Sequence, residues 1–245
     1  MLSLQKKYLI INYIKKMRTL DKYFGIILFL FFSFSLFSQP TPPGTVRLNS
    51  SDTSGKYAAF IDQSEICIMY WQDFLHWTEI KYGKESPEYK ALLPDSIILS
   101  QVFQGDWQCP VFRHYPIVGI SYEQAIAYCA WRSDRVNERY ELLRLENKRN
   151  KKKYNYIVTY SLPTETDFEE AYKQQKIKTN YTKLTFVVWE KGKFANIADN
   201  AQELTANKTV LTGENSGKLI FQPYKEPNAI VGFRCVANIY PITNK

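Results

Sequence analysis

The longest apolar stretch of the chain lies near its beginning, where residues 24–37 read FGIILFLFFSFSLF. This stretch is shorter than the roughly 20 residues that a helix needs to cross a bilayer. Basic residues precede it and a Pro- and Thr-rich segment follows it, which is the order found in a secretory signal peptide. We therefore predict a signal peptide over residues 1–38, cleaved between Ser38 and Gln39, with Met17 as an alternative start. A buried core helix fits less well, because the stretch has no polar face.

Extended segments are predicted at several places after this stretch. Residues 39–55 are rich in Pro, Ser, Thr and Gly, which predicts an extended lead-in to a domain over residues 56–245. The apolar runs at residues 58–61 and 97–99 suit short strands, and residues 154–160 (YNYIVTY) alternate as a strand does.

A first helix is predicted to start at Cys67. From there the apolar residues Tyr70, Phe74 and Trp77 recur at intervals of four and three, which places them on one face of a helix. Gly83 is predicted to end this helix.

Two more helices carry start signals. Ser121 and Gln124 have capping-box spacing, and the helix that they start is predicted to continue through Leu142 toward a basic loop at residues 148–153. Thr164 is predicted to cap the third helix, because acidic residues crowd the turns that follow it.

The last third of the chain has only short apolar runs, at residues 184–189, 219–221 and 230–236, with turn residues between them. This pattern predicts small strands joined by long loops. Helices in the first part followed by loop-rich strands indicate an α+β domain.

Composition and charge narrow the function classes. Hydrophobic residues make up 45% and charged residues 23%, as in soluble globular proteins. Residues 1–38 carry six lysines or arginines and one aspartate, so only three of the eight formal positive charges remain after them. That charge is too small to indicate nucleic acid binding. Residues 148–153 (KRNKKK) form a solvated loop or contact an acidic partner or phosphate.

Four cysteines and two histidines limit the metal chemistry. An even number of cysteines in an exported chain permits two disulfides. No two cysteines are close enough in sequence for a zinc ribbon.

Five motifs follow one another along the chain: residues 60–66 (FIDQSEI), 115–131 (YPIVGISYEQAIAYCAW), 161–171 (SLPTETDFEEA), 200–205 (NAQELT) and 232–235 (GFRC). Taken in order, they resemble the formylglycine-generating enzyme, or sulfatase-modifying, domain family. The resemblance implies a C-type-lectin-like fold with short helices packed on small β-sheets. It assigns structural roles to Trp131, Pro163, Thr164, Glu165, Gly232, Phe233 and Arg234.

The resemblance also implies a structural disulfide between Cys129 and Cys235, which would join the second helix to the final strand. The alternative is two separate buried thiols. Cys67 and Cys109 match no family bridge, and their pairing stays open.

A candidate calcium site is implied at Asn196, Asn200 and Glu203, because these positions resemble a family motif that organises calcium and hard oxygen ligands suit that ion. The alternative is that Asn200 and Glu203 bond the loop backbone. Arg234 is expected to form a buried ion pair with Glu165 or Glu203.

Active members of the family use two closely spaced cysteines that bind copper just before the GFRC motif. Residues 130–234 contain no cysteine, so we predict no catalytic residue and no enzyme activity. Trp131 and Trp189 are expected to pack in the core or to line a ligand cleft.

Residues 93–98 (LPDSII) and 131–138 (WRSDRVNE) resemble a subgroup, the gliding-motility lipoproteins K and J, although no lipid-attachment cysteine follows the apolar stretch. We therefore expect a non-catalytic binding or scaffold module with an envelope protein partner, located in the periplasm, at the outer membrane or outside the cell. The resemblance links its partners to gliding or type 9 secretion. The alternatives are a diverged oxidoreductase and a lectin-like ligand-binding domain.

Overall fold

The computed structural model describes residues 41–48, 59–175, 184–187 and 193–242. All of them lie in the second of the two compact units into which the chain divides after Pro40. The predicted signal peptide and Trp189 lie outside the described residues. No helix in the described part is both long enough and apolar enough to cross a membrane.

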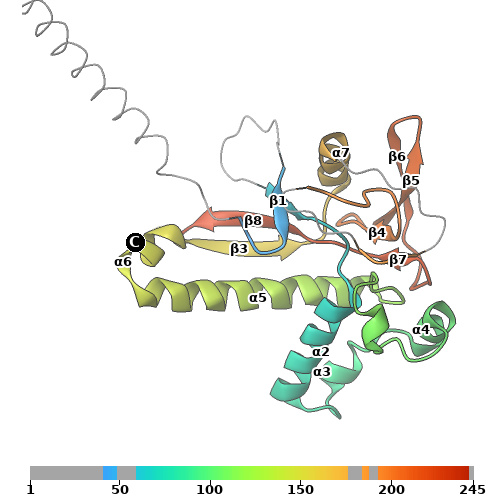
Figure 1. Cartoon of the computed structure of the whole chain (residues 1–245), viewed down its shortest axis with the longest axis horizontal. Coiled ribbons are helices and arrows are strands. Elements are labelled where there is room, and N and C mark those ends of the chain that lie inside the picture. The colour runs from blue at the N-terminus through green and yellow to red at the C-terminus, as the bar shows by residue number, and fades with distance from the viewer. Residues whose placement is uncertain (1–40, 49–58, 176–183, 188–192, 243–245) are drawn as a thin grey trace, which may run out of the picture. The chain divides into compact units, whose positions relative to one another are not determined.

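The first sheet has four antiparallel strands in the order β1-β2-β8-β3 (Figure 1). These are β1 (Thr45–Arg47), β2 (Ala59–Asp62), β8 (Val236–Pro241) and β3 (Tyr156–Ser161). Strand β2 confirms the strand predicted at residues 58–61, and β3 confirms the one predicted at residues 154–160. Because β1 pairs with β2, the predicted lead-in contributes an edge strand to this sheet.

The second sheet has the order β6-β5-β4-β7. It contains β4 (Gln202–Leu204), β5 (Thr209–Asn215), β6 (Lys218–Pro223) and β7 (Val231–Gly232). Only β4 and β7 run parallel within it. The short strands and connecting loops match the prediction for residues 219–221 and 230–236, whereas residues 184–187, the described part of the first predicted run, form no strand.

The first helix, α2 (Ile68–Tyr82), ends at Gly83 as predicted, because Gly83 adopts a φ of 90°. Its predicted face is wrong in part. The buried residues include Trp71 and Phe74, whereas Tyr70 is 38% exposed. The buried stripe is shifted by one residue from the predicted one. At the start of α2, the amides of Ile68 and Met69 donate to the carbonyls of Tyr115 and Arg113.

The strand predicted at residues 97–99 is wrong, because α4 (Ser96–Phe103) covers them. Asp95 accepts hydrogen bonds from the backbone amides of Ile97 and Ile98 and so starts a helix. Two shorter helical segments, α3 (Pro87–Lys90) and a 3-10 turn at Pro110–Phe112, flank α4.

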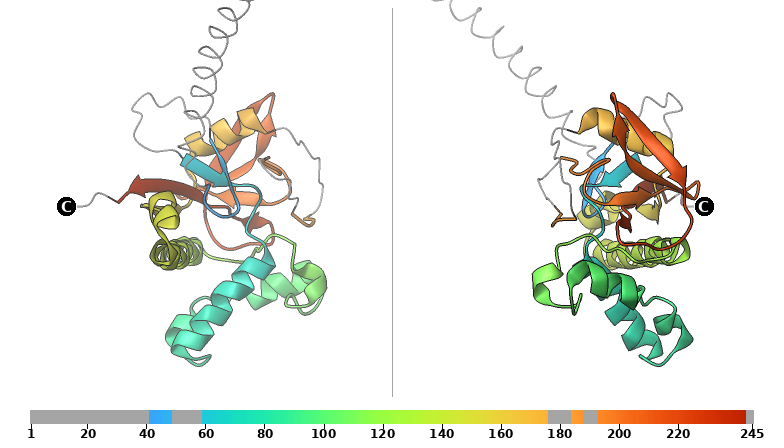
Figure 2. Two further views of the ribbon diagram at one scale, coloured as in Figure 1. Left: turned by 60° about the vertical axis from the view of Figure 1, so that its left-hand side comes forward. Right: turned by 90° about the vertical axis from the view of Figure 1, so that its right-hand side faces the viewer.

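The long helix α5 (Tyr122–Glu146) starts with the predicted capping box of Ser121 and Gln124. It lies between the first sheet and helices α2 to α4, as the views in Figures 1 and 2 agree. The loop predicted at residues 148–153 is wrong, because α6 (Lys148–Lys153) is a short helix capped by Asn147.

The third predicted helix is α7 (Glu165–Gln174), capped by Thr164 as expected. Its buried Phe168 and Ala171 belong to a cluster with Ile61 and Leu211. A larger cluster joins α2, α5 and β3 around Trp71. The chain is therefore an α+β fold, with the helices segregated around two small sheets.

Candidate functional site

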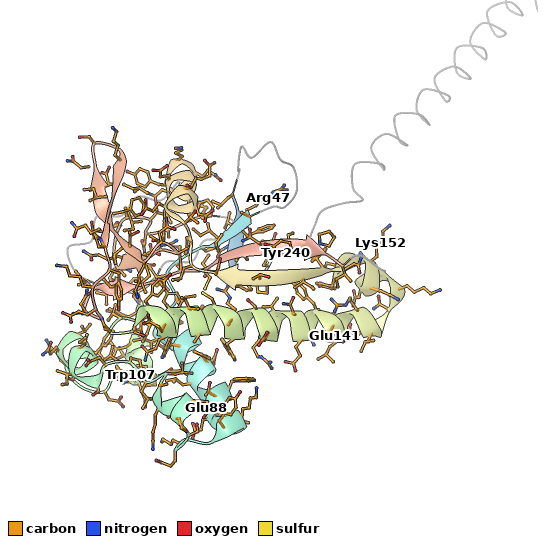
Figure 3. The ribbon with its side chains drawn as sticks, turned by 180° about the vertical axis from the view of Figure 1, so that it is seen from behind. Arg47, Glu88, Trp107, Glu141, Lys152 and Tyr240 are labelled. Carbon is orange, nitrogen blue, oxygen red and sulfur yellow. The ribbon has the colours of Figure 1, made fainter. Side chains whose placement is uncertain are left out.

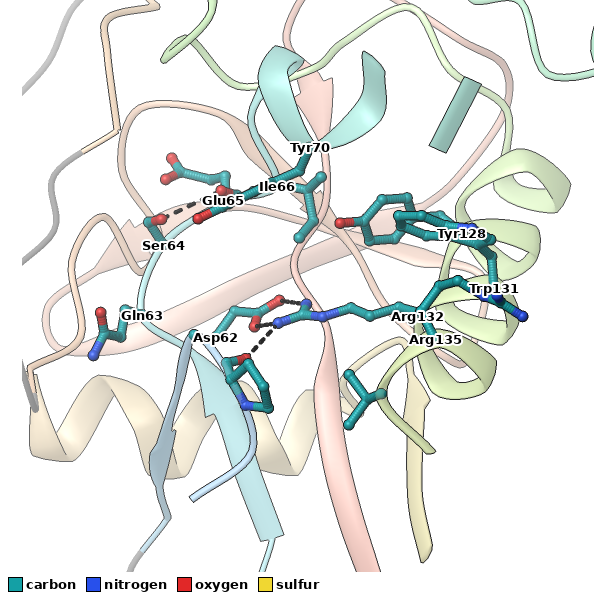
Figure 4. A pocket seen from close by; sticks show the side chains of 13 residues that line it. Asp62, Gln63, Ser64, Glu65, Ile66, Tyr70, Tyr128, Trp131, Arg132 and Arg135 are labelled. Carbon is teal, nitrogen blue, oxygen red and sulfur yellow. Dashed lines mark hydrogen bonds and ion pairs between the residues drawn. The ribbon is translucent and has the colours of Figure 1, made fainter. Parts of the chain in front are cut away.

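A pocket of about 450 Å³ opens where the end of β2, the start of α2 and the middle of α5 meet (Figure 4). An ion pair lies on one side of it, where the Arg132 guanidinium faces both carboxylate oxygens of Asp62 at 2.7 and 2.8 Å. The rest of the lining is aromatic and polar: Gln63, Ser64, Glu65, Ile66, Tyr70, Tyr128, Trp131, Arg135 and Val136, with Pro43 and Gly44 from the lead-in.

The Asp62–Arg132 pair fixes the pocket floor. Asp62 also accepts from the Cys235 backbone amide at 2.8 Å, and Arg132 stacks over the Tyr160 ring at 4.1 Å. Burial opposes the charged form of Arg132, yet the facing Asp62 carboxylate leaves the pKa of Arg132 above its ordinary value. Both carboxylate oxygens of Asp62 are therefore engaged in hydrogen bonds within the protein.

The aromatic wall comes from α2 and α5. Trp131 packs on Phe74 with ring centroids 5.0 Å apart, and Tyr128 stacks on Trp71 at 5.8 Å. The Trp131 indole nitrogen finds no hydrogen-bond acceptor among the described residues. Burial raises the pKa of Tyr128 well above its ordinary value, so that phenol stays protonated as a hydrogen-bond donor. Trp131 was expected to pack in the core or to line a ligand cleft, and it does both: it packs against the core and lines the pocket.

The predicted calcium residues lie beside the pocket, because Asn196 and Asn200 both bond to Glu65, which also lines the pocket. Asn200 bonds the backbone of Thr185 through both ends of its amide, which directs its nitrogen toward Glu65 at 2.9 Å. Asn196 also donates its amide nitrogen to Glu65, at 3.3 Å. Glu203 faces Arg234 instead, with oxygens 2.5 and 2.8 Å from the guanidinium.

These three side chains therefore present no shared set of oxygens to one point. Two of them direct nitrogen toward a carboxylate, and the third is neutralised by an arginine. In the part of the chain that the structure describes, no group of three His, Cys, Asp or Glu side chains could hold a metal ion. The residues as arranged do not fit calcium, and calcium binding stays a prediction from the resemblance.

Arg234 confirms the expected buried ion pair, with Glu203 as its partner. Both side chains are fully buried, and Arg234 also donates to the backbone carbonyls of Asp62, Ala195 and Asn196. Glu165, the other expected partner, instead accepts from the Thr209 hydroxyl at 2.8 Å.

The remaining motif residues hold the backbone together. The Pro163 carbonyl accepts from the Ala206 amide, which ties the start of α7 to the turn after β4. A Cβ on Gly232 would lie 2.7 Å from the Ile117 carbonyl oxygen, so only glycine fits there. Phe233 is fully buried next to Tyr128.

The cysteines divide into a contacting pair and two others. The sulfur atoms of Cys129 and Cys235 lie 3.5 Å apart in the core as free thiols. Cys67 is buried at the start of α2, and Cys109 is exposed. The structure therefore brings together the two cysteines that the resemblance pairs, whereas the disulfide itself stays a prediction.

The sequence pattern did not indicate the Asp62–Arg132 side of the pocket, and it placed Tyr70 in a buried stripe. One feature pointed there: Arg132 follows the apolar side of α5 one residue after Trp131, where a charge needs a partner.

Comparisons with known proteins identify a family and structurally similar chains. The model of the sulfatase-modifying factor enzyme 1-like domain matches residues 53–225. No curated protein sequence matches the chain. Among solved structures, the crystal structure of CarF is similar with 11% sequence identity and a TM-score of 0.40, over 76% of this chain and 87% of that chain. The mixed architecture of short helices and small sheets agrees with the C-type-lectin-like fold of the matched family.

Proposed function

Because the chain belongs to the sulfatase-modifying factor enzyme 1-like domain family, we propose that it keeps the family fold as a non-catalytic, exported binding or scaffold module of the cell envelope. The proposal has three parts: absent oxidase chemistry, a pocket that binds a partner, and an envelope location.

The placement of the cysteines carries the first part. All four lie in the described residues, and the one contacting pair, Cys129 and Cys235, is buried. Burial and the neighbouring Cys129 raise the pKa of Cys235 well above its ordinary value, whereas copper is held by thiolates. Cys109 alone is exposed, and one thiol does not make the pair that the oxidase chemistry needs.

The pocket at α2 and α5 supports the second part. Its aromatic wall and ion-paired floor are rigid, and pockets of this kind bury ligand side chains with little reorganisation. Arg135 lines it with a side chain that is 32% exposed, and the Trp131 indole nitrogen has no acceptor among the described residues. A partner that inserts an apolar side chain flanked by hydrogen-bond acceptors or a carboxylate fits this lining.

The third part rests on sequence. The apolar stretch at residues 24–37 favours export, and residues 131–138 resemble the gliding-motility lipoproteins. This second segment supplies Trp131, Arg132 and Arg135 to the pocket. We therefore propose that the partner is an envelope protein of a gliding or type 9 secretion complex.

The test is crosslinking of the tagged protein in native cells, followed by mass spectrometry of the recovered proteins. The wild type is compared with Arg135→Glu, which reverses a charge at the pocket, and with Lys84→Glu, an exposed control outside it. We expect the wild type and the control to recover the same envelope proteins and Arg135→Glu to lose them. Equal recovery by all three would contradict a role for the pocket.

Two alternative functions can be tested by simple binding measurements. A diverged oxidoreductase that uses Cys67 or Cys109 requires copper binding that is lost in Cys67→Ser or Cys109→Ser. A lectin-like domain requires glycan binding that Arg135→Glu or Trp131→Ala weakens.

A further inference from the structure

The far end of α5 carries a concentrated positive charge. Helix α6 (Lys148–Lys153) reads KRNKKK, so five of its six residues are basic, and none of the six is buried. Just before it, Leu145 leaves 79% of its side chain exposed. Because none of its side chains is buried, this short helix contributes little to the core, and its composition is free to serve another purpose.

The neighbouring sheet adds exposed apolar side chains. Ile157 on β3 and Tyr240 on β8 are paired across the strands and are 49% and 39% exposed. Their neighbours Tyr156 and Val158 are buried against α5, and side chains alternate along a strand. Ile157 and Tyr240 therefore face away from α5.

The charges and the apolar pair share one side of the molecule. Figure 3 shows Lys152 and Tyr240 on the sheet side of α5, whereas Glu141 extends from the opposite side of the helix. Together, Lys148–Lys153, Ile157 and Tyr240 form what we name the tip surface. Figure 1 places this surface at the end of α5 that is remote from α2 and α4.

The chemistry of the tip surface selects its partner. Four of its five cations are lysines, which act as hydrated point charges on flexible stems, whereas arginine suits a fixed bidentate contact with one carboxylate. Tyrosine and isoleucine beside lysines are the composition of surfaces that insert shallowly at the interface of an anionic bilayer. We infer that the tip surface docks on anionic phospholipid headgroups. This docking is separate from the pocket and does not depend on the proposed function.

Electrostatics sets the expected size of the effect. Each basic residue near an anionic membrane surface strengthens binding about fivefold at moderate salt. Lys151, Lys152 and Lys153 together therefore contribute on the order of a hundredfold, and the contribution falls as salt screens the charges.

The experiment is sedimentation of the full chain with vesicles of phosphatidylcholine alone or with 30 mol % phosphatidylglycerol, at about 50 and 500 mM salt. The tip variant is Lys151→Glu/Lys152→Glu/Lys153→Glu. The control is Lys84→Glu/Lys218→Glu/Lys225→Glu, which changes the net charge equally at exposed positions elsewhere. The residues before position 41 are the same in all three proteins, so their own affinity for lipid cancels.

We expect the tip variant to lose at least tenfold in binding to the anionic vesicles at low salt and the control to lose much less. A further variant, Ile157→Thr/Tyr240→Ser, should weaken the binding that remains at high salt. The inference is overturned if the tip variant and the control lose binding equally, or if neither loses any. The inference is also overturned if soluble polyglutamate binds the tip surface as well as the anionic vesicles do, because the partner is then an acidic protein.

Discussion

The side-chain amide of Asn137 bonds both backbone groups of Val158, accepting from its N–H and donating to its C=O at 2.8 Å each. One turn earlier on α5, Ser133 accepts from the Tyr160 amide at 2.8 Å. Asn137 and Ser133 therefore supply hydrogen-bond partners to backbone groups on the outer edge of β3, the last strand of the first sheet. An edge strand with free backbone groups invites pairing with another chain, so α5 closes this edge with side chains.

Asn137→Ala is therefore expected to lower the free energy of unfolding by about 2 kcal/mol, because it leaves a donor and an acceptor of Val158 without partners. It should also promote self-association, because the edge of β3 becomes available. Urea denaturation measures the first effect, and light scattering during size-exclusion chromatography measures the second. Glu141→Ala, exposed on the same helix, is the control and should change neither. A variant that is as stable and as monomeric as the wild type would show that the amide has no such role.

Local signals explain which parts of the fold the sequence could predict. Helix caps and helix stops act within one turn of the helix, as Ser121, Thr164 and Gly83 do. Their effects can therefore be predicted from the sequence alone. The strand predicted at residues 97–99 failed because three consecutive apolar residues fit a strand or a buried helix equally, and Asp95 decided between them.

Long-range contacts explain what the sequence could not predict. Asp62 and Arg132 are 70 positions apart, and Glu65 and Asn200 are 135 apart. Nothing in the spacing of these residues indicates that they meet. The family motif did locate Arg234 and Glu203, whose side chains face each other in the structure.

In the buried Arg234–Glu203 ion pair, removing one partner should destabilise the fold more than removing both. Arg234→Met leaves the Glu203 carboxylate without its counterion, and we expect a loss of about 3–5 kcal/mol in the free energy of unfolding. The double variant Arg234→Met/Glu203→Leu removes both charges and should be less destabilised than the single one. Urea denaturation of the four proteins in the cycle measures this, and additive losses would refute the coupling.

The buried carboxyls predict a pH dependence. Burial raises the pKa of Glu65 above its ordinary value of 4.5, and burial raises the pKa of Glu203 to about 7 despite the opposing effect of Arg234. The folded state therefore holds more protons than the unfolded chain above pH 4.5. The stability from these protons is complete below pH 4.5 and is lost as the pH rises through the raised pKa of each group, which is about 7 for Glu203.

Glu65→Gln removes one of these carboxyls, so its stability relative to the wild type should improve as the pH rises above 4.5. Urea denaturation across this range measures the difference, with the exposed Glu141→Gln as the control. A difference that stays constant with pH would show that Glu65 does not titrate in this range.

The contact between Cys129 and Cys235 predicts a disulfide in an oxidising compartment. The two residues are 106 positions apart, and closing a loop of that size stabilises a fold by about 4–5 kcal/mol in the chain-entropy model. We expect alkylation in denaturant, without reductant, to label only Cys67 and Cys109 in protein recovered from the envelope. Cys109→Ser should leave one labelled cysteine, and Cys129→Ser should expose Cys235 to the reagent. Labelling of all four wild-type cysteines would mean that the core pair stays reduced, and labelling of none would mean that Cys67 and Cys109 also pair.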